Sequence, residues 1–114
     1  MSQRAVQARV LASALEELSI AMYYAFEQRD NHLPVPRGDV PAARRKVESA
    51  LALYGAVVAD DKAAVAEASI IHASVCEEHD HGRAELTEWI PSIRRRAARW
   101  EVIDEEENDG LQVS

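Results

Sequence analysis

The chain has 114 residues, of which 47% are hydrophobic and 5% aromatic, and its formal net charge is −7. This length suits one domain with one core and excludes two ordinary domains, and the negative charge disfavours general binding to phosphate backbones. Alanine, leucine and valine are abundant, whereas there are only four glycines and four prolines. We therefore expect an all-α fold, a small antiparallel helical bundle.

Two further features indicate where the protein works. Cys76 is the single cysteine and cannot form an internal disulfide. Residues 1–10 lack the continuous apolar run of a secretory signal, and charges interrupt every stretch that approaches the roughly 20 apolar residues of a membrane span. The sequence predicts a soluble, cytoplasmic protein with no membrane partner.

The first predicted helix covers residues 3–29, which contain no glycine or proline. Its main apolar stripe recurs at helical spacing and consists of Leu11, Leu15, Leu18, Met22 and Phe26. A second, weaker stripe lies about a third of a turn or more away and consists of Val6, Val10, Ala21 and Tyr24. A helix that is apolar on two sides needs two neighbours, so we expect the second stripe to form an interface.

The stretch NHLPVPRGD, residues 31–39, interrupts the helical period and predicts a connection. Asp39 is a suitable N-cap for a second helix. The apolar face of that helix is Val47, Ala50, Leu51, Tyr54, Val57 and Val58. Asp60 or Asp61 can cap a third helix, although a kinked continuous helix remains an alternative at this point.

The third helix is expected to reach Ile90, where Pro91 would end or kink it. Its apolar face is Ile71, Val75, Leu86 and Trp89. A short fourth helix should follow, with a stripe of Ile93, Ala97, Trp100 and Ile103. The single domain would then be residues 1–103, and residues 104–114 would form an acidic, disordered tail.

One cluster could bind a metal. In a continuous third helix, His72, Cys76 and His79 fall within about 60° of one another. Imidazole and thiolate ligands suit zinc or another late transition metal, with a fourth ligand from His32, a carboxylate or a second copy. The more ordinary interpretation is that the histidines are hydrogen-bonded at a helix interface and Cys76 is a small core residue, with no cofactor.

Two carboxylate patterns offer further alternatives. Glu78 and His81 form the Glu-x-x-His pair of di-iron bundles, but His81 would point away from the apolar face. Two Glu-x-x-Asp pairs could hold hydrated magnesium for hydrolysis of a phosphate-containing substrate, namely Glu27 with Asp30 and Glu77 with Asp80. This detail resembles all-α nucleotide pyrophosphohydrolases of the MazG type. After Glu16 and Glu17, however, Ile20 stands where that family has its third glutamate.

A basic stretch lies close to the acidic end of the chain. Four arginines could contact phosphates and Trp100 could stack on a base, the arginines being Arg94, Arg95, Arg96 and Arg99. The acidic tail that follows could fold back and neutralise these charges, and in the simpler interpretation Trp100 packs in the core. The sequence therefore disfavours a nucleic-acid partner.

No nucleophile arrangement and no phosphate-binding glycine loop is present in the sequence. Helices of unequal length leave apolar surface uncovered, and a symmetric homodimer is the simplest way to bury it. We therefore expect a non-enzymatic interaction protein, homodimeric, that acts as an adaptor, assembly factor or modulator of another protein. The alternative is a metal-binding bundle, with a transition metal at the cysteine and histidines or with magnesium and phosphohydrolase activity.

Overall fold

The computed structural model describes residues 2–30, 39–75 and 80–113, and within them the protein is all-helical with no strand. The four helices are α1 (Gln3–Asp30), α2 (Asp39–Val57), α3 (Lys62–Val75) and α4 (Asp80–Val113). The all-α prediction is confirmed. The first helix and the start of the second lie within one residue of their expected positions.

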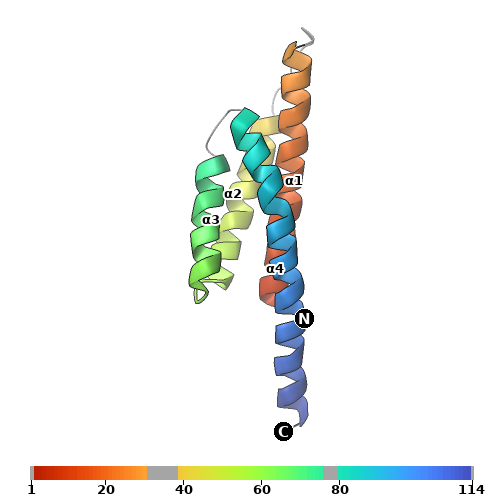
Figure 1. Ribbon diagram of the computed structural model, residues 1–114, viewed down its shortest axis with the longest axis vertical. Coiled ribbons are helices and arrows are strands. Elements are labelled where there is room, and N and C mark those ends of the chain that lie inside the picture. Colours follow the sequence, from red (N-terminus) through yellow and green to blue (C-terminus); the bar gives the residue numbers. More distant parts are fainter. Residues whose placement is uncertain (1, 31–38, 76–79, 114) are drawn as a thin grey trace.

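The bundle is built around the two long helices, α1 and α4, which lie side by side (Figure 1). Among the described residues, three ion pairs join the two helices: Arg4 with Asp104, Arg9 with Glu101, and Glu16 with Arg94. From one pair to the next, the residue number rises along α1 and falls along α4. This order shows that α1 and α4 are antiparallel. Helix α2 covers another side of α1, and α3 contacts only α2 and α4 within the described residues.

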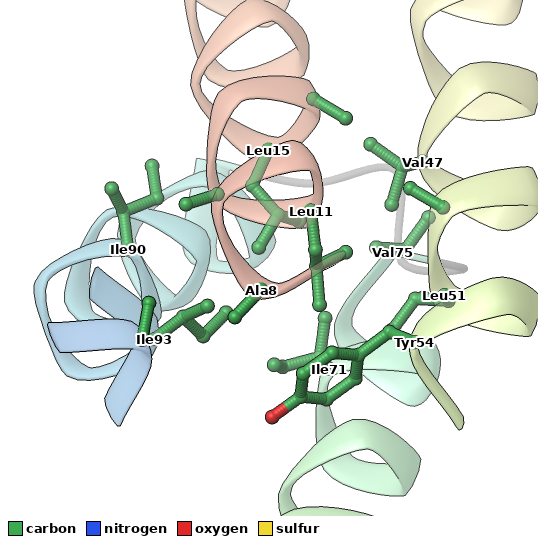
Figure 2. Packing of buried hydrophobic residues seen from close by; sticks show 14 of the residues in the cluster. Ala8, Leu11, Leu15, Val47, Leu51, Tyr54, Ile71, Val75, Ile90 and Ile93 are labelled. Atoms are coloured by element: carbon green, nitrogen blue, oxygen red, sulfur yellow. The ribbon is translucent and has the colours of Figure 1, made fainter. Parts of the chain in front are cut away.

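The core runs along the inner faces of all four helices (Figure 2). From α1, the predicted leucines Leu11, Leu15 and Leu18 are fully buried. Val47 and Tyr54 of α2 are also fully buried, as is Val58 in the turn after α2. Alanines at positions 5, 8 and 12 of α1 are also buried. Ala8 lies beside Ile93 of α4 in Figure 2, because side chains this small allow two helices to approach closely.

Side-chain caps fix the start of two helices. The Ser2 hydroxyl accepts a hydrogen bond from the backbone N–H of Ala5 at 3.1 Å, which is an N-cap that the sequence analysis did not single out. The Asp61 carboxylate accepts one from the N–H of Ala64, also at 3.1 Å. Of the two aspartates considered as caps for the third helix, Asp61 is therefore the one that fills the role.

The predicted third helix was too long. Helix α3 ends at Val75 and α4 begins at Asp80, so the chain reverses before Ile90. The reversal brings Ile71 and Ile93 into one core, since both side chains are fully buried. A single straight helix of about 40 Å would carry these two residues far apart along its axis.

The prediction that Pro91 separates two helices was also wrong. Pro91 lies inside α4, with an exposed side chain, and the helix continues to Val113. The residues after Pro91 pack along α1 through Ile93, Ala97 and Trp100, all buried, and this burial stabilises the helix despite the missing backbone N–H. The acidic residues 104–113, expected to be disordered, belong to the same helix.

Candidate functional site

The metal-site prediction falls largely outside the described residues. His72 is exposed on α3, and Cys76 and His79 are not described. The single helix that would align the three residues ends at Val75. Within residues 2–30, 39–75 and 80–113, no group of three or more histidines, cysteines, aspartates or glutamates could hold a metal ion. The site therefore stays a prediction, and its helical spacing no longer supports it.

His72 instead borders a groove between α2 and α3 with a volume of about 640 Å³. Leu51 and Ala68 also line it, together with Glu48 and Gly55. Glu48 is the acidic residue of this lining and His72 its only imidazole. One carboxylate and one imidazole are too few for a closed tetrahedral site.

The carboxylates considered for magnesium or iron are separated or undescribed. Glu16 pairs with Arg94 of α4, whereas Glu17 accepts a hydrogen bond from Lys46 of α2 at 2.8 Å, so these neighbours point to opposite flanks of α1. Ile20 is half exposed. The other candidates lie outside the described side chains: Glu27, Asp30, Glu77, Glu78, Asp80 and His81.

The four arginines of α4 do not form one patch. Arg94 is paired with Glu16, and Arg96 turns inward to Glu67 of α3 at 3.2 Å. Arg95 and Arg99 are exposed and form no ion pair with another residue that the structure describes. Trp100 is only 5% exposed, which confirms that it packs in the core and removes it as a stacking platform for a base.

The pair of Glu67 and Arg96 belongs to a largely buried polar cluster at the α3–α4 contact. Their side chains are 9% and 15% exposed, and Ser92 donates a second hydrogen bond to the same Glu67 oxygen at 3.4 Å. The Arg96 guanidinium also lies 5.9 Å from the centre of the Trp100 ring. Tyr54 packs beside it, and burial raises the pKa of the Tyr54 hydroxyl. No pattern in the sequence indicates this pair, because the two residues are 29 positions apart and lie on different helices.

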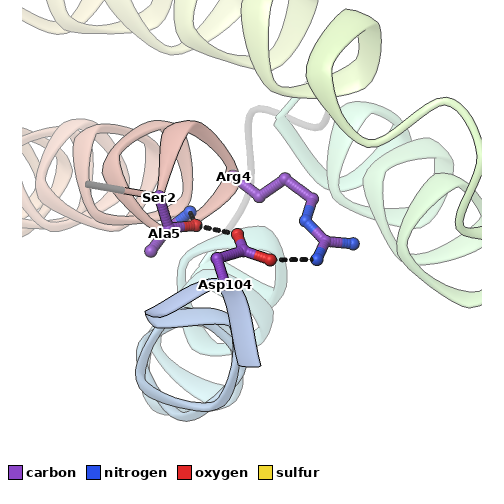
Figure 3. Close-up of polar contacts among 4 residues, drawn as sticks. All are labelled: Ser2, Arg4, Ala5 and Asp104. Carbon is purple, nitrogen blue, oxygen red and sulfur yellow. Dashed lines mark hydrogen bonds and ion pairs between the residues drawn. The ribbon is translucent and has the colours of Figure 1, made fainter. Parts of the chain in front are cut away.

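A second polar cluster closes the start of α1 against α4 (Figure 3). Ser2 donates a hydrogen bond to one oxygen of the Asp104 carboxylate, and the Arg4 guanidinium pairs with the other at 2.5 Å. The Arg4 hydrogen bond, followed by that from Ser2, lowers the pKa of Asp104 below its ordinary value. This cluster ties the acidic end of α4 to the first turn of α1.

The lowered pKa predicts how stability depends on pH. A carboxylate with a folded pKa below its unfolded pKa stabilises the protein above the unfolded value, about 4, and this contribution is lost as the pH falls through the folded pKa. Acidification below pH 4 is therefore expected to lower the melting temperature of the wild type more than that of Asp104→Asn. Circular-dichroism melts measure this, with exposed Glu88→Gln as the control. Equal losses in wild type and Asp104→Asn would contradict the role of this cluster.

Of the predicted interface residues, Val10 is 46% exposed, Val6 and Ala21 are half-buried, and the Tyr24 side chain is not described. The ion pair between Glu17 and Lys46 fixes the level of α2 beside α1. Val10 lies seven residues before Glu17 on α1, and Leu53, which is 56% exposed, lies seven residues after Lys46 on α2. Because the two helices are antiparallel, Val10 and Leu53 lie at the same level (Figure 1). Four residues further stand Val6 and Val57. We call these three valines and one leucine together the α1–α2 strip: Val6, Val10, Leu53 and Val57.

The outer face of α4 is also partly apolar. Val102 is 55% exposed and stands on the same side of α4 as Arg95 and Arg99. Ile103, 45% exposed, points about 100° away and borders a groove with Asp61 and Ala63. No helix in the described part of the chain is both long and apolar enough to cross a lipid bilayer.

We compared the chain with known protein families, curated proteins and solved structures. The chain matches no protein-family model, no curated protein and no solved structure.

Proposed function

We propose that this is a non-enzymatic helical interaction protein that acts as a homodimer in the cytoplasm, as an adaptor, assembly factor or modulator of a partner protein. One observation carries the proposal. Among the described residues, eight large hydrophobic side chains are between 38% and 56% exposed: Val10, Ile20, Tyr23, Leu53, Val65, Ile70, Val102 and Ile103.

Single exposed apolar side chains are ordinary on protein surfaces, so their arrangement matters more than their number. Val10 and Leu53 stand at the same level of neighbouring helices, and Val102 is exposed on the outer face of α4. Two separate apolar surfaces suit a protein that binds a second copy through one and a partner protein through the other. The described residues give no comparable observation in favour of metal binding or phosphohydrolase activity.

The oligomeric state tests this proposal. Size-exclusion chromatography with light scattering at tens of micromolar protein should give a mass about twice the 12.7 kDa of one chain. A monomer at every concentration would overturn the proposal. The double variant Val10→Asp with Leu53→Asp then tests the interface expected from the sequence. If the α1–α2 strip forms the dimer, this variant is monomeric; if another face does, it remains a dimer and the strip stays open to a partner.

A further inference from the structure

We propose that two copies of the chain pair antiparallel through the outer face of α4, with the twofold axis at Val102. This inference rests on the proposed homodimer and names the surface that forms it. The occupant of the surface is a second copy, and the evidence for it is the charge pattern of α4 together with the position of its acidic end.

The charges of α4 are segregated along its length. Four arginines stand between residues 94 and 99, and six acidic residues and no basic ones stand between residues 101 and 109. A helix with a basic segment followed by an acidic segment is complementary to its own reversed copy. An antiparallel pair places each basic segment beside an acidic one, and an isologous interface forms both contacts at once.

Two arginines are available for such a contact. Arg95 and Arg99 are exposed, lack an ion pair with any other described residue, and stand one turn apart, where like charges destabilise a helix. The other two arginines, Arg94 and Arg96, are already paired within the chain. An acidic segment from outside would relieve the repulsion between Arg95 and Arg99.

The acidic segment of the same chain cannot supply this contact. Helix α4 is continuous to Val113, so residue 105 lies about 9 Å further along the helix axis than Arg99. The residues after 105 lie still further from Arg99. The folding back of an acidic tail, considered from the sequence, requires a break that α4 does not have. The acidic segment of a second copy meets no such restriction.

Helix α4 continues beyond its contact with the start of α1. Asp104 contacts Ser2 at the start of α1, and the nine residues of α4 beyond it project about 13 Å past the bundle (Figure 1). Glu105, the first of them, is exposed. The molecule is correspondingly long, 65 × 21 × 20 Å. In an antiparallel pair this projecting end lies along the outer face of the other copy's α4.

The sequence spacing fixes the register. Positions 95, 102 and 109 are seven residues apart and fall on one line of the helix, as do positions 99 and 106. With the axis at Val102, this side chain meets its own copy, and the segment 95–99 lies level with the segment 105–109 of the second copy. The 55% exposed Val102 supplies the apolar centre, and the charged segments on both sides supply orientation.

A charge exchange tests this arrangement. The acidic variant carries Arg95→Glu and Arg99→Glu, and the basic variant carries Glu106→Arg and Asp109→Arg. Each variant alone should dimerise at least about tenfold more weakly than wild type, because like charges then face each other across the axis. An equimolar mixture should form a heterodimer, since both contacts regain opposite charges. Analytical ultracentrifugation measures all three samples, and Arg45→Glu, a single charge reversal at an exposed position of α2, should leave the dimer intact.

The outcomes separate this inference from the proposed function. A wild-type monomer overturns both. A wild-type dimer that resists both charge variants but dissociates with Val10→Asp and Leu53→Asp retains the function and overturns the α4 interface. If both charge variants dimerise more weakly than wild type and their mixture does not form a heterodimer, the antiparallel register is also overturned. A salt titration adds an independent readout, because screening should weaken the wild-type dimer progressively.

Discussion

Replacement of Arg96 by methionine is expected to lower the free energy of unfolding by about 3 kcal/mol. The change leaves the Glu67 carboxylate, whose side chain is 9% exposed, without its cationic partner inside the α3–α4 contact. Methionine fills the volume of the arginine stem but cannot neutralise the carboxylate. Urea denaturation at constant protein concentration measures the loss, and exposed Arg45→Met should change stability by less than about 0.5 kcal/mol.

The double variant Arg96→Met with Glu67→Leu distinguishes charge from packing. Removal of one partner of a buried ion pair is costly, whereas replacement of both by apolar side chains of similar size is often neutral. Since Ala64, Ile71 and Ile93 are buried nearby in the same core, the double variant should recover most of the lost stability. If it is as unstable as Arg96→Met, the arginine acts through packing against Trp100 rather than through its charge.

The local pattern of the sequence was sufficient for α1 and for the start of α2, and it limited the cap of α3 to Asp60 or Asp61. Leu11, Leu15 and Leu18 are spaced for one face of a helix, and all three are fully buried. The end of α1 at Asp30 and the start of α2 at Asp39 flank a stretch with two prolines and a glycine, which disrupt helices for reasons contained within a few residues. Residues 31–38 themselves lie outside the described part of the chain. Such features depend little on the rest of the fold.

The boundary between α3 and α4 depends on the whole fold and was missed. No glycine or proline stands between Val75 and Asp80, whereas Pro91 offers an obvious interruption. The chain nevertheless reverses before Asp80 and continues through Pro91, because burial of Ile93, Ala97 and Trp100 against α1 outweighs one missing backbone hydrogen bond. Local propensity identified the weak point of the helix but not the tertiary contacts that compensate for it.

The same limit applies to the charged residues. From the sequence, Arg94, Arg95, Arg96 and Arg99 form a single basic stretch. Their roles differ because successive residues of a helix point about 100° apart, so Arg94 pairs with Glu16 of α1 and Arg96 with Glu67 of α3, whereas Arg95 and Arg99 form no ion pair with another described residue. Of the four arginines, two therefore remain for the contact that we propose with the acidic end of a second copy.

Two adjacent residues of α1 should differ strongly in their effect on stability. Leu11→Ala is expected to cost about 3 kcal/mol and to lower the melting temperature by roughly 10 °C, because Leu11 is fully buried between α2 and α4. Val10→Ala should change stability by less than about 0.5 kcal/mol, since Val10 is 46% exposed and alanine favours the helix more than valine does. Thermal melts of both variants at one protein concentration measure this difference.

The comparison of Leu11 with Val10 tests the orientation of α1, on which the surfaces of the molecule depend. Rotation of α1 by one residue would bring Val10 to the buried position of Leu11 and Leu11 to the buried position of Ala12, and would remove the α1–α2 strip. Equal losses in the two variants would therefore contradict the placement of Val10 and Leu53 on a shared outer surface. A large loss for Leu11→Ala alone leaves Val10 available for binding, because a side chain that contributes little to folding can be covered by another protein without competition from the core.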